Sequence, residues 1–353
     1  MRIPSAEESP QPEAEEKMTG DNKMSNERQK RNHRLDNIRA VAIIMIVLGH
    51  SIIIYSSSWN LYQTTVSVPV LDVLKDVINV MQLPIFFALS GYFFAYTLKK
   101  KNIVMIIRDK IKRLLVPFLA FGLLWLFPVR MLLDYPGYEN AGLMNIIINK
   151  ILFGSDNGHL WYLPTLFLIF IVYAFLMFFE RKCIGEQAAY YCNFFAGICL
   201  YFLQMNITIP SYAGFFCRHF IWFSLGLIIC NCNAHLVSLK GYVKFAFIIT
   251  DVFCIAFYIF SRNNLALFIS SILSVVIIFS LRLNFKNRLI DFISDNSYGL
   301  YLFHSPLIYI TYTYFAESSP VFVVFMNFFL FGGLSLLFAC LLRKSRFAFL
   351  MGE

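Results

Sequence analysis

Apolar runs long enough to cross a lipid bilayer recur along this sequence and limit what it can fold into. A membrane-spanning helix needs about 20 mainly apolar residues. The 353-residue chain is 58% hydrophobic and 14% charged, whereas a soluble domain is about 25% charged. A water-soluble core could not bury that much apolar surface, so we predict an all-α, polytopic integral membrane bundle. The predicted spans are residues 38–56, 73–97, 113–133, 161–179, 188–206, 214–231, 243–261, 264–281, 293–315 and 320–342, which gives about ten transmembrane helices.

The positive charges of the loops predict which way the bundle faces. With ten spans, the loops on the side of the N-terminus all carry Lys or Arg, whereas the opposite loops carry little beyond Arg130, Lys150 and Arg262. Because cytoplasmic loops are enriched in Lys and Arg, both termini are predicted to be cytoplasmic. The predicted divisions are a disordered, polar N-terminal tail over 1–34, a membrane domain over 35–343 and a short cytoplasmic C-terminal tail over 344–353.

The net charge and the cysteines argue against a nucleic-acid-binding protein and against a metal-binding protein. The net charge of +9 follows from the cytoplasmic loops, and no basic patch with interleaved aromatic residues lies in a soluble segment, so we expect no nucleic-acid partner. Most of the eight cysteines lie in apolar runs, where cysteine acts as a small hydrophobe. Cys230 and Cys232 lack metal-ligand spacing. We therefore expect free thiols and no metal.

The first predicted span carries two polar residues that are costly inside a bilayer. Arg39 and His50 are eleven positions apart, and at about 100° per residue both side chains return to one helix face, separated by a rise of about 16 Å. Alone, Arg39 could extend to the lipid headgroups and His50 could serve a helix contact. Together on one face, behind Asp36, they favour a functional site.

A basic cluster precedes the third predicted span. Lys110, Lys112 and Arg113 stand at the start of that helix, on the predicted cytoplasmic side. One interpretation is a topology signal. The other is a docking site for an anionic cofactor, whose phosphates Lys and Arg bind well. The sequence leaves both open.

Polar and aromatic residues also gather toward the opposite side. His159 and Trp161 mark a membrane interface, where a histidine is often simply solvated. Topology does not explain Arg218 on that side, so we expect a carboxylate partner in the substrate or in the bundle. Tyr301 and His304 lie near one face of the ninth span, which predicts a polar seam between helices or the wall of a cavity.

Five stretches together resemble one known family. They run from about 34 to 310, nearly the whole membrane domain, and they stand in the order in which the family has them. They are Asp36-x-x-Arg39 with Arg39-x10-His50, Phe86-Phe87-Ala88-Leu89-Ser90-Gly91-Tyr92, Lys112-Arg113-Leu114-Leu115-Val116-Pro117, His159-Leu160-Trp161-Tyr162-Leu163, and Ser297-Tyr298-Gly299-Leu300-Tyr301-Leu302-Phe303-His304. On these motifs the chain resembles acyltransferase family 3, the bacterial integral-membrane acyltransferases. It departs at Asn37, where the family usually has glycine.

The resemblance implies an enzyme, a membrane O-acyltransferase and most simply an O-acetyltransferase. Such proteins move an acyl group, commonly acetyl from cytoplasmic acetyl-CoA, to a hydroxyl of a cell-envelope or exported glycan or of a small molecule. We therefore expect a multi-pass protein of the plasma (inner) membrane, in the stand-alone form, that modifies a polysaccharide. The alternative is a transporter or flippase for a polysaccharide or an acylated intermediate. The oligomeric state, a homodimer included, is left open.

The resemblance also implies roles for the polar residues. His50 is expected to act as a general base on the acceptor hydroxyl or to accept the acyl group itself, and Asp36 is expected to orient Arg39. The expected catalytic residues are His50, Arg39 and Asp36; the expected residues for acetyl-CoA, or another acyl-CoA, are Arg39, Lys110, Lys112 and Arg113; and the expected acceptor residues are His159, Trp161, Arg218, Tyr301 and His304.

Overall fold

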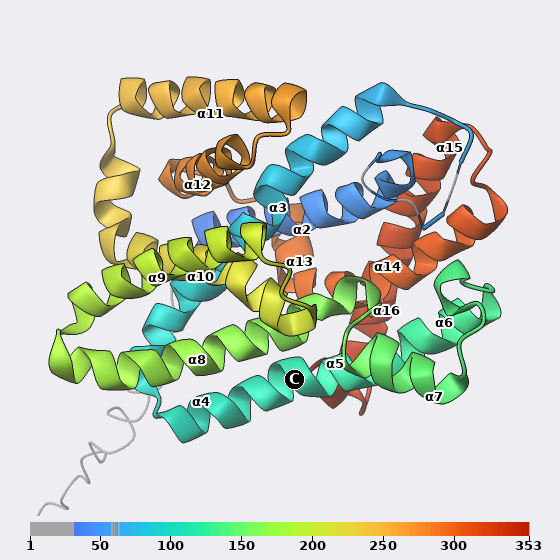
Figure 1. Cartoon of the computed structure of the whole chain (residues 1–353), viewed down its shortest axis with the longest axis horizontal. Helices are drawn as coiled ribbons and strands as arrows, with labels where there is room; N and C mark the ends of the chain where they lie inside the picture. Colours follow the sequence, from blue (N-terminus) through green and yellow to red (C-terminus); the bar gives the residue numbers. More distant parts are fainter. Residues whose placement is uncertain (1–31, 58, 60, 63, 353) are drawn as a thin grey trace, which may run out of the picture.

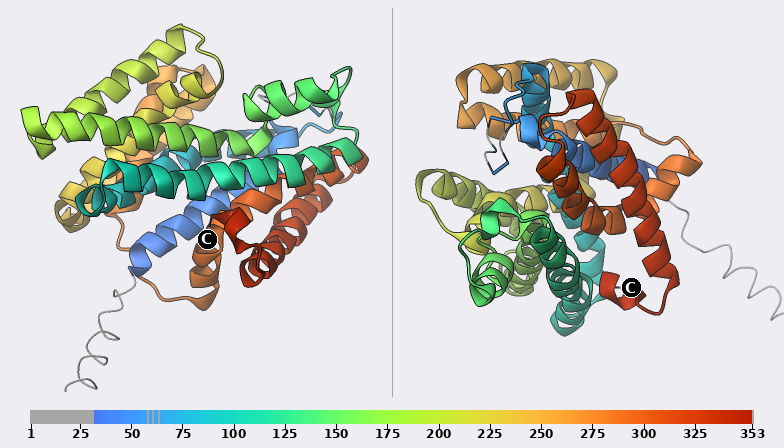
Figure 2. Two further views of the ribbon diagram at one scale, coloured as in Figure 1. Left: turned by 90° about the horizontal axis from the view of Figure 1, so that it is seen from below. Right: turned by 90° about the vertical axis from the view of Figure 1, so that its right-hand side faces the viewer.

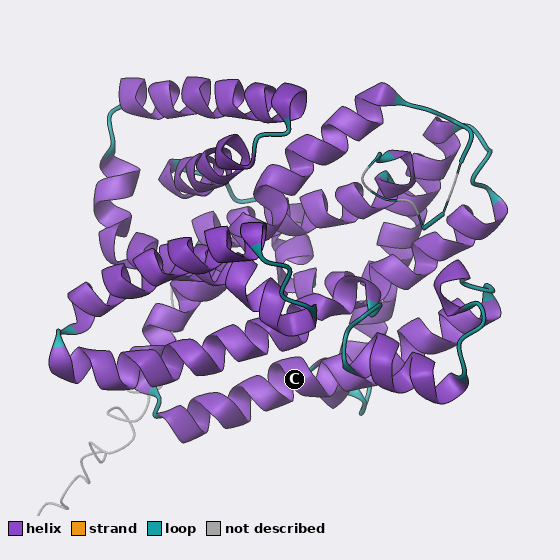
Figure 3. Ribbon diagram, in the orientation of Figure 1, coloured by secondary structure: helices purple, strands orange, loops and turns teal. Residues whose placement is uncertain are grey.

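The computed structural model describes residues 32–57, 59, 61–62 and 64–352, and these residues form helices and no strand (Figure 1, Figure 3). This confirms the all-helical fold predicted from the apolar runs. The predicted tail over 1–34 lies outside the described residues except for its last three. Asn32 caps the first described helix, since its side-chain oxygen accepts a hydrogen bond from the backbone N–H of Leu35 at 3.4 Å.

The described residues form a succession of α-helices, with turns of 3₁₀ and π-helix among them. The α-helices are α2 (His33–Ser51), α3 (Pro69–Lys100), α4 (Ile103–Lys110), α5 (Val116–Phe121), α6 (Phe127–Leu132), α7 (Leu143–Asn145), α8 (Tyr162–Cys183), α9 (Glu186–Asn206), α10 (Ser211–Ser238), α11 (Gly241–Ser261), α12 (Asn264–Ser280), α13 (Arg288–Asp295), α14 (Ser297–Tyr314), α15 (Pro320–Phe325) and α16 (Gly332–Lys344). Turns of 3₁₀ helix cover Ile53–Tyr55, Pro136–Tyr138, Gly158–Trp161 and Ala348–Met351. Turns of π-helix cover Ile111–Leu115, Gly122–Leu126, Ile146–Leu152 and Met326–Phe331.

Six helices among the described residues are long and apolar enough to cross a membrane. They are Pro69–Lys100, Ile103–Leu132, Gly158–Cys183, Ser211–Ser238, Gly241–Ser261 and Pro320–Lys344. The other four predicted spans coincide with α2, α9, α12 and α14. Of these, α2 and α14 hold the polar residues predicted to be functional, and α12 has only 17 residues. A multi-pass bundle is therefore confirmed, while ten spans and cytoplasmic termini stay predictions.

Helix α3 runs through the middle of the bundle, where it contacts α2, α10 and α12 (Figure 1, Figure 2). Two glycines bring the backbones of α3 and α10 together. A Cβ at Gly91 would lie 2.0 Å from the carbonyl oxygen of Phe223, and a Cβ at Gly226 would lie 2.0 Å from that of Ala88. Small residues permit such close contact between membrane helices. Gly91 of the motif therefore serves close backbone packing, whereas the Ser90 hydroxyl lies 3.2 Å from that of Tyr162.

Prolines inside helices free backbone carbonyls, and other helices supply the missing donors. A proline has no N–H, so the carbonyl four residues earlier loses its partner. In α3, Pro84 frees the carbonyl of Val80, and the Ser271 hydroxyl of α12 donates to it at 2.8 Å. Without water in an apolar interior, such a donor from a neighbouring helix is what makes the proline tolerable. This contact fastens α12 to α3.

The same arrangement fastens α14 to the helix that begins at Ile103. Pro117 cannot donate to the carbonyl of Arg113, and the Tyr298 hydroxyl donates to that carbonyl at 2.7 Å. The residues just before Pro117 form a π-helical turn, a local irregularity that is frequent at functional sites. The backbone of Arg113 is thereby held in the π-helical turn that precedes α5.

The contact between α3 and α10 predicts which glycines tolerate a methyl group. Gly226→Ala should destabilise the protein by about 1–3 kcal/mol, because the new Cβ would overlap the backbone of α3. Gly333→Ala is the matched control, since a Cβ there has no neighbour within 4 Å. The measurement is the thermal unfolding midpoint in detergent. Equal midpoints for the two variants would contradict the proposed packing.

Candidate functional site

Three adjacent cavities connect the predicted site residues. The basic pocket, about 560 Å³, is lined by cations that include Arg39, Lys110 and Arg113. The histidine pocket, about 80 Å³, is lined by residues that include His50 and His159. The arginine pocket, about 560 Å³, has Arg218, Arg262, Asp76 and aromatic rings in its wall.

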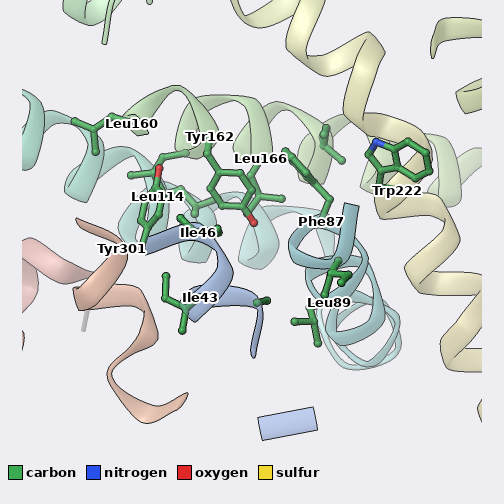
Figure 4. Close-up of a cluster of buried hydrophobic side chains, with 14 of the residues drawn as sticks. Ile43, Ile46, Phe87, Leu89, Leu114, Leu160, Tyr162, Leu166, Trp222 and Tyr301 are labelled. Atoms are coloured by element: carbon green, nitrogen blue, oxygen red, sulfur yellow. The ribbon is translucent and has the colours of Figure 1, made fainter. Parts of the chain in front are cut away.

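Shared walls place the histidine pocket between the other two. Phe86 and Tyr162 line both the basic pocket and the histidine pocket. Leu83 and Trp161 line both the histidine pocket and the arginine pocket. Figure 4 shows Tyr162, Ile46 of α2 and Tyr301 of α14, which all line the histidine pocket. Two ligands, one in each large pocket, would thus both adjoin the small pocket that contains His50.

Two cations of the basic pocket are held by contacts with other groups. An Asp36 carboxylate oxygen accepts a hydrogen bond from the Arg39 guanidinium at 3.4 Å, and the Ser294 hydroxyl donates to the same oxygen at 3.4 Å. The contact joins Asp36 to Arg39, and the role of Asp36 in orienting Arg39 stays a prediction. The Lys110 ammonium lies 3.4 Å from the centre of the Phe170 ring, a cation–π contact.

Not every predicted cation reaches this pocket. Lys112 is exposed and does not line it, although the neighbouring Arg113 does. The binding role predicted for Lys112 stays a prediction without support from the geometry. In its place, the end of the chain contributes to the wall. After α16 the chain turns back, and the buried residues Met351 and Gly352 line the basic pocket.

His50 and His304 form a hydrogen-bonded pair between α2 and α14. Nδ1 of His50 lies 2.7 Å from Nε2 of His304, and the rings stack with their centres 5.0 Å apart. Nδ1 of His304 faces the backbone carbonyl oxygens of Leu300 and Tyr301 at 3.0 and 2.9 Å. The sequence placed these histidines in different motifs, and the fold brings them together.

The carbonyl oxygens decide where the protons of a neutral pair lie. A carbonyl only accepts, so Nδ1 of His304 carries its proton and Nε2 presents a lone pair. His50 must then donate from Nδ1, which leaves the lone pair of its Nε2 available. The Tyr312 hydroxyl donates to the backbone carbonyl of His50 and fixes the end of α2. The arrangement is that of a positioned general base.

His159 lies against the same pair. Its ring centre is 5.4 Å from that of His304, and its Nε2 lies 3.3 Å from the carbonyl oxygen of Leu302. Pro306, four residues later in α14, frees that carbonyl. Nε2 of His159 is therefore the donor, and its buried Nδ1 has no hydrogen-bond partner in the described part of the chain. The predicted acceptor residue Tyr301 contributes its hydroxyl, which donates to the backbone carbonyl of His159 at 2.6 Å.

A buried arginine that the sequence did not identify as functional holds the loop that carries His159. The Arg130 guanidinium donates to the backbone carbonyl of Asp156 at 2.9 Å and to the Asp156 carboxylate at 3.2 Å. It also donates to the Tyr309 hydroxyl at 2.8 Å. Gly158, at φ +56°, has no room for a Cβ beside the guanidinium. The sequence did contain a signal for this contact. Arg130 is a cation on the side where the predicted topology has few Lys and Arg residues, and Asp156 follows in the next loop.

Two further polar residues that the sequence analysis missed lie next to His50. Gly49 provides the space, since a Cβ there would lie 3.1 Å from the Lys75 ammonium and 2.9 Å from the Gln82 side-chain oxygen. Both side chains are buried, and Gln82 also lines the histidine pocket. A lysine in the apolar run of α3 was the sign that could have found this cluster.

Trp161 stands in a stack of rings at the wall between the histidine and arginine pockets. Its ring centre lies 4.3 Å from that of Phe215 and 5.2 Å from that of His219, and His219 in turn stacks on Phe87 at 4.7 Å. These two stacked rings restrict the orientation of Trp161. The predicted acceptor residues Trp161 and Arg218 thus share one cavity, while His159, Tyr301 and His304 gather around His50.

A comparison with known protein families identifies the class of this helical membrane protein. The family model described as an acyltransferase domain matches residues 32–344. The chain therefore belongs to acyltransferase family 3, and it is a membrane acyltransferase, as its motifs predicted. No match was found among curated proteins or among solved structures.

Because Pro306 leaves the carbonyl of Leu302 free to accept from His159, we predict that Pro306 determines the position of the His159 ring. Pro306→Ala should restore an N–H that competes for this carbonyl and should release the His159 ring. Acyl transfer should then fall by about tenfold to a hundredfold, with an unfolding midpoint at least as high as before. Pro320→Ala is the control, because Pro320 begins α15 and frees no interior carbonyl. Unchanged transfer by the Pro306 variant would contradict this role.

Proposed function

We propose that this protein transfers an acetyl group from acetyl-CoA to a hydroxyl of a cell-envelope or exported glycan, at the plasma membrane. One observation carries the proposal: the small pocket that contains the His50–His304 pair shares walls with a cationic pocket on one side and an aromatic, arginine-containing pocket on the other. Donor and acceptor would therefore meet at the histidines.

The basic pocket suits the phosphates of the donor. Arg39, Lys110 and Arg113 line a cavity that is large enough for a substantial part of a nucleotide-sized ligand. Arg and Lys bind phosphate oxygens through charge-assisted hydrogen bonds, and the planar guanidinium can do so with two bonds at once. The rise of about 16 Å from Arg39 to His50 along α2 is of the same order as the length of a pantetheine arm. A thioester could thus reach past Tyr162 to His50.

The histidine pair supplies the proton transfers. Nε2 of His50 takes the proton of the acceptor hydroxyl while the oxygen attacks the thioester carbonyl carbon, and Nε2 of His304 stabilises the resulting imidazolium by accepting from Nδ1. The tetrahedral intermediate then collapses with cleavage of its carbon–sulfur bond. The imidazolium returns the proton to the thiolate, so the products are an ester and CoA with a free thiol.

The other buried groups around His50 suit the charge that develops during the reaction. The tetrahedral intermediate carries negative charge on the former carbonyl oxygen, and a positioned cation nearby stabilises it. The buried Lys75 ammonium beside Gly49 is the nearest described group of that kind on α3. The lone pair on Nδ1 of His159 can accept a hydrogen bond from a second acceptor hydroxyl and so hold the sugar.

The direct test is acetyl transfer by purified protein. With acetyl-CoA labelled in the acetyl group and a glycan acceptor, the native protein should release CoA and label the glycan, and His50→Ala should lower the rate by about 10²–10⁴-fold. His235→Ala is the matched control, since His235 is an exposed histidine at the end of α10 that lines none of the three pockets. Full activity of the His50 variant would overturn the proposal. Glycan movement without CoA release would instead support a transporter.

A further inference from the structure

The arginine pocket carries a positive charge that the reaction itself does not use. We propose that the acceptor is an anionic sugar, which binds with its carboxylate or phosphate on Arg218. This inference rests on the proposed function in one respect only, because it takes the arginine pocket to be the acceptor site. It adds the chemical class of the acceptor, which neither the motifs nor the family comparison specifies.

The first step is the charge balance of the pocket wall. Three charged side chains line the pocket: Asp76, Arg218 and Arg262. Asp76 is buried and forms an ion pair with the Arg262 guanidinium, so these two charges compensate each other. Arg218 has no hydrogen-bond or ion-pair partner among the described residues, although it projects from α10 into the same wall. The pocket thus has one positive charge to spare.

The second step is the position of this charge. In the predicted topology Arg218 lies on the side of the bundle where the positive-inside rule leaves few cations, so that rule does not account for it. The other large cavity, the basic pocket, already has the cations that suit the donor. A guanidinium with five donors and no acceptor is well suited to a carboxylate or phosphate, which it can bind with two parallel bonds. The missing partner of Arg218 is therefore supplied by the substrate.

The third step is the chemistry of the remaining wall. Aromatic rings surround the pocket, namely those of Trp161, Tyr201, Phe215, Trp222 and Tyr258. The apolar face of a sugar ring packs on such rings, while a few polar groups fix its orientation. Asn79 is one of these polar groups, since its side-chain oxygen accepts from Gln82 and its amide N–H groups remain for a ligand. The volume of about 560 Å³ lies within the range of ligand sites.

The last step links the charge to the reaction. Trp161 and Leu83 belong to the walls of both the arginine pocket and the histidine pocket. A sugar whose anionic group is held by Arg218 and whose ring packs on Trp161 would direct a hydroxyl past this shared wall to His50. Arg218 then selects the acceptor without taking part in the proton transfers.

Binding to purified full-length protein tests the inference without any acyl transfer. The probes are two pairs that differ in charge alone as far as possible: trigalacturonic acid with its carboxyl-reduced trisaccharide, and glucose 1-phosphate with glucose. Isothermal titration should show at least one anionic member binding about tenfold or more tightly than its neutral partner, because hydrogen bonds between charged groups are stronger than those between neutral ones. The arm that shows the preference tells a carboxylate from a phosphate, and either supports the inference.

Substitutions locate the preference. Arg218→Gln should remove it and leave neutral binding unchanged, Arg218→Lys should keep part of it, and Arg181→Gln, at an exposed arginine outside the three pockets, should not alter it. Equal binding of both members in each pair, or a preference that survives Arg218→Gln, would overturn the inference.

The same variants separate this inference from the proposed function. His50→Ala should retain the charge preference, because His50 is not part of the arginine pocket. If the native protein shows the preference but no acetyl transfer, only the proposed reaction fails. If His50-dependent transfer is equally efficient to charged and neutral members, only the inference fails.

Discussion

A buried backbone carbonyl must have a donor, and this requirement organises the bundle around its site. Pro84, Pro117 and Pro306 each deprive a carbonyl of its helical partner. Side chains from other helices supply the three missing hydrogen bonds. In an apolar interior each unsatisfied carbonyl would cost several kcal/mol. The prolines therefore act as attachment points between helices that are distant in the sequence.

The attachment point at Pro306 has a chemical consequence. Because the freed carbonyl of Leu302 only accepts, it fixes which nitrogen of His159 carries the proton. One turn earlier in α14, the carbonyls of Leu300 and Tyr301 do the same for His304, and His304 then does so for His50. A chain of hydrogen bonds that begins at the backbone thus ends at the free lone pair of His50. The general base that we propose, His50, is therefore oriented by contacts from α14.

The sequence was sufficient for the features that depend on local patterns. Apolar runs predicted the helices, and the spacing of Asp36, Arg39 and His50 predicted their place on one helix. It was insufficient where a side chain is functional because of a distant neighbour. Arg130 looked like one loop charge until the fold set it between the loop at Asp156 and α14.

The basic cluster shows the same limit at the scale of one residue. Lys112 and Arg113 are neighbours with the same charge, and nothing in their order tells which one enters a cavity. Direction around a helix depends on how that helix packs, and here a π-helical turn changes the direction locally. Only the fold separates Arg113, which lines the basic pocket, from Lys112, which does not.

We propose that donor and acceptor reach His50 from opposite faces of the membrane. Sealed vesicles that contain the purified protein test it, with labelled acetyl-CoA and a glycan acceptor, neither of which crosses a bilayer. Labelled glycan is expected only when donor and acceptor are on opposite sides of the vesicle membrane, whichever way the protein is inserted. Labelling of the glycan when both reactants are on the same side, with no labelling when they are on opposite sides, would contradict this proposal.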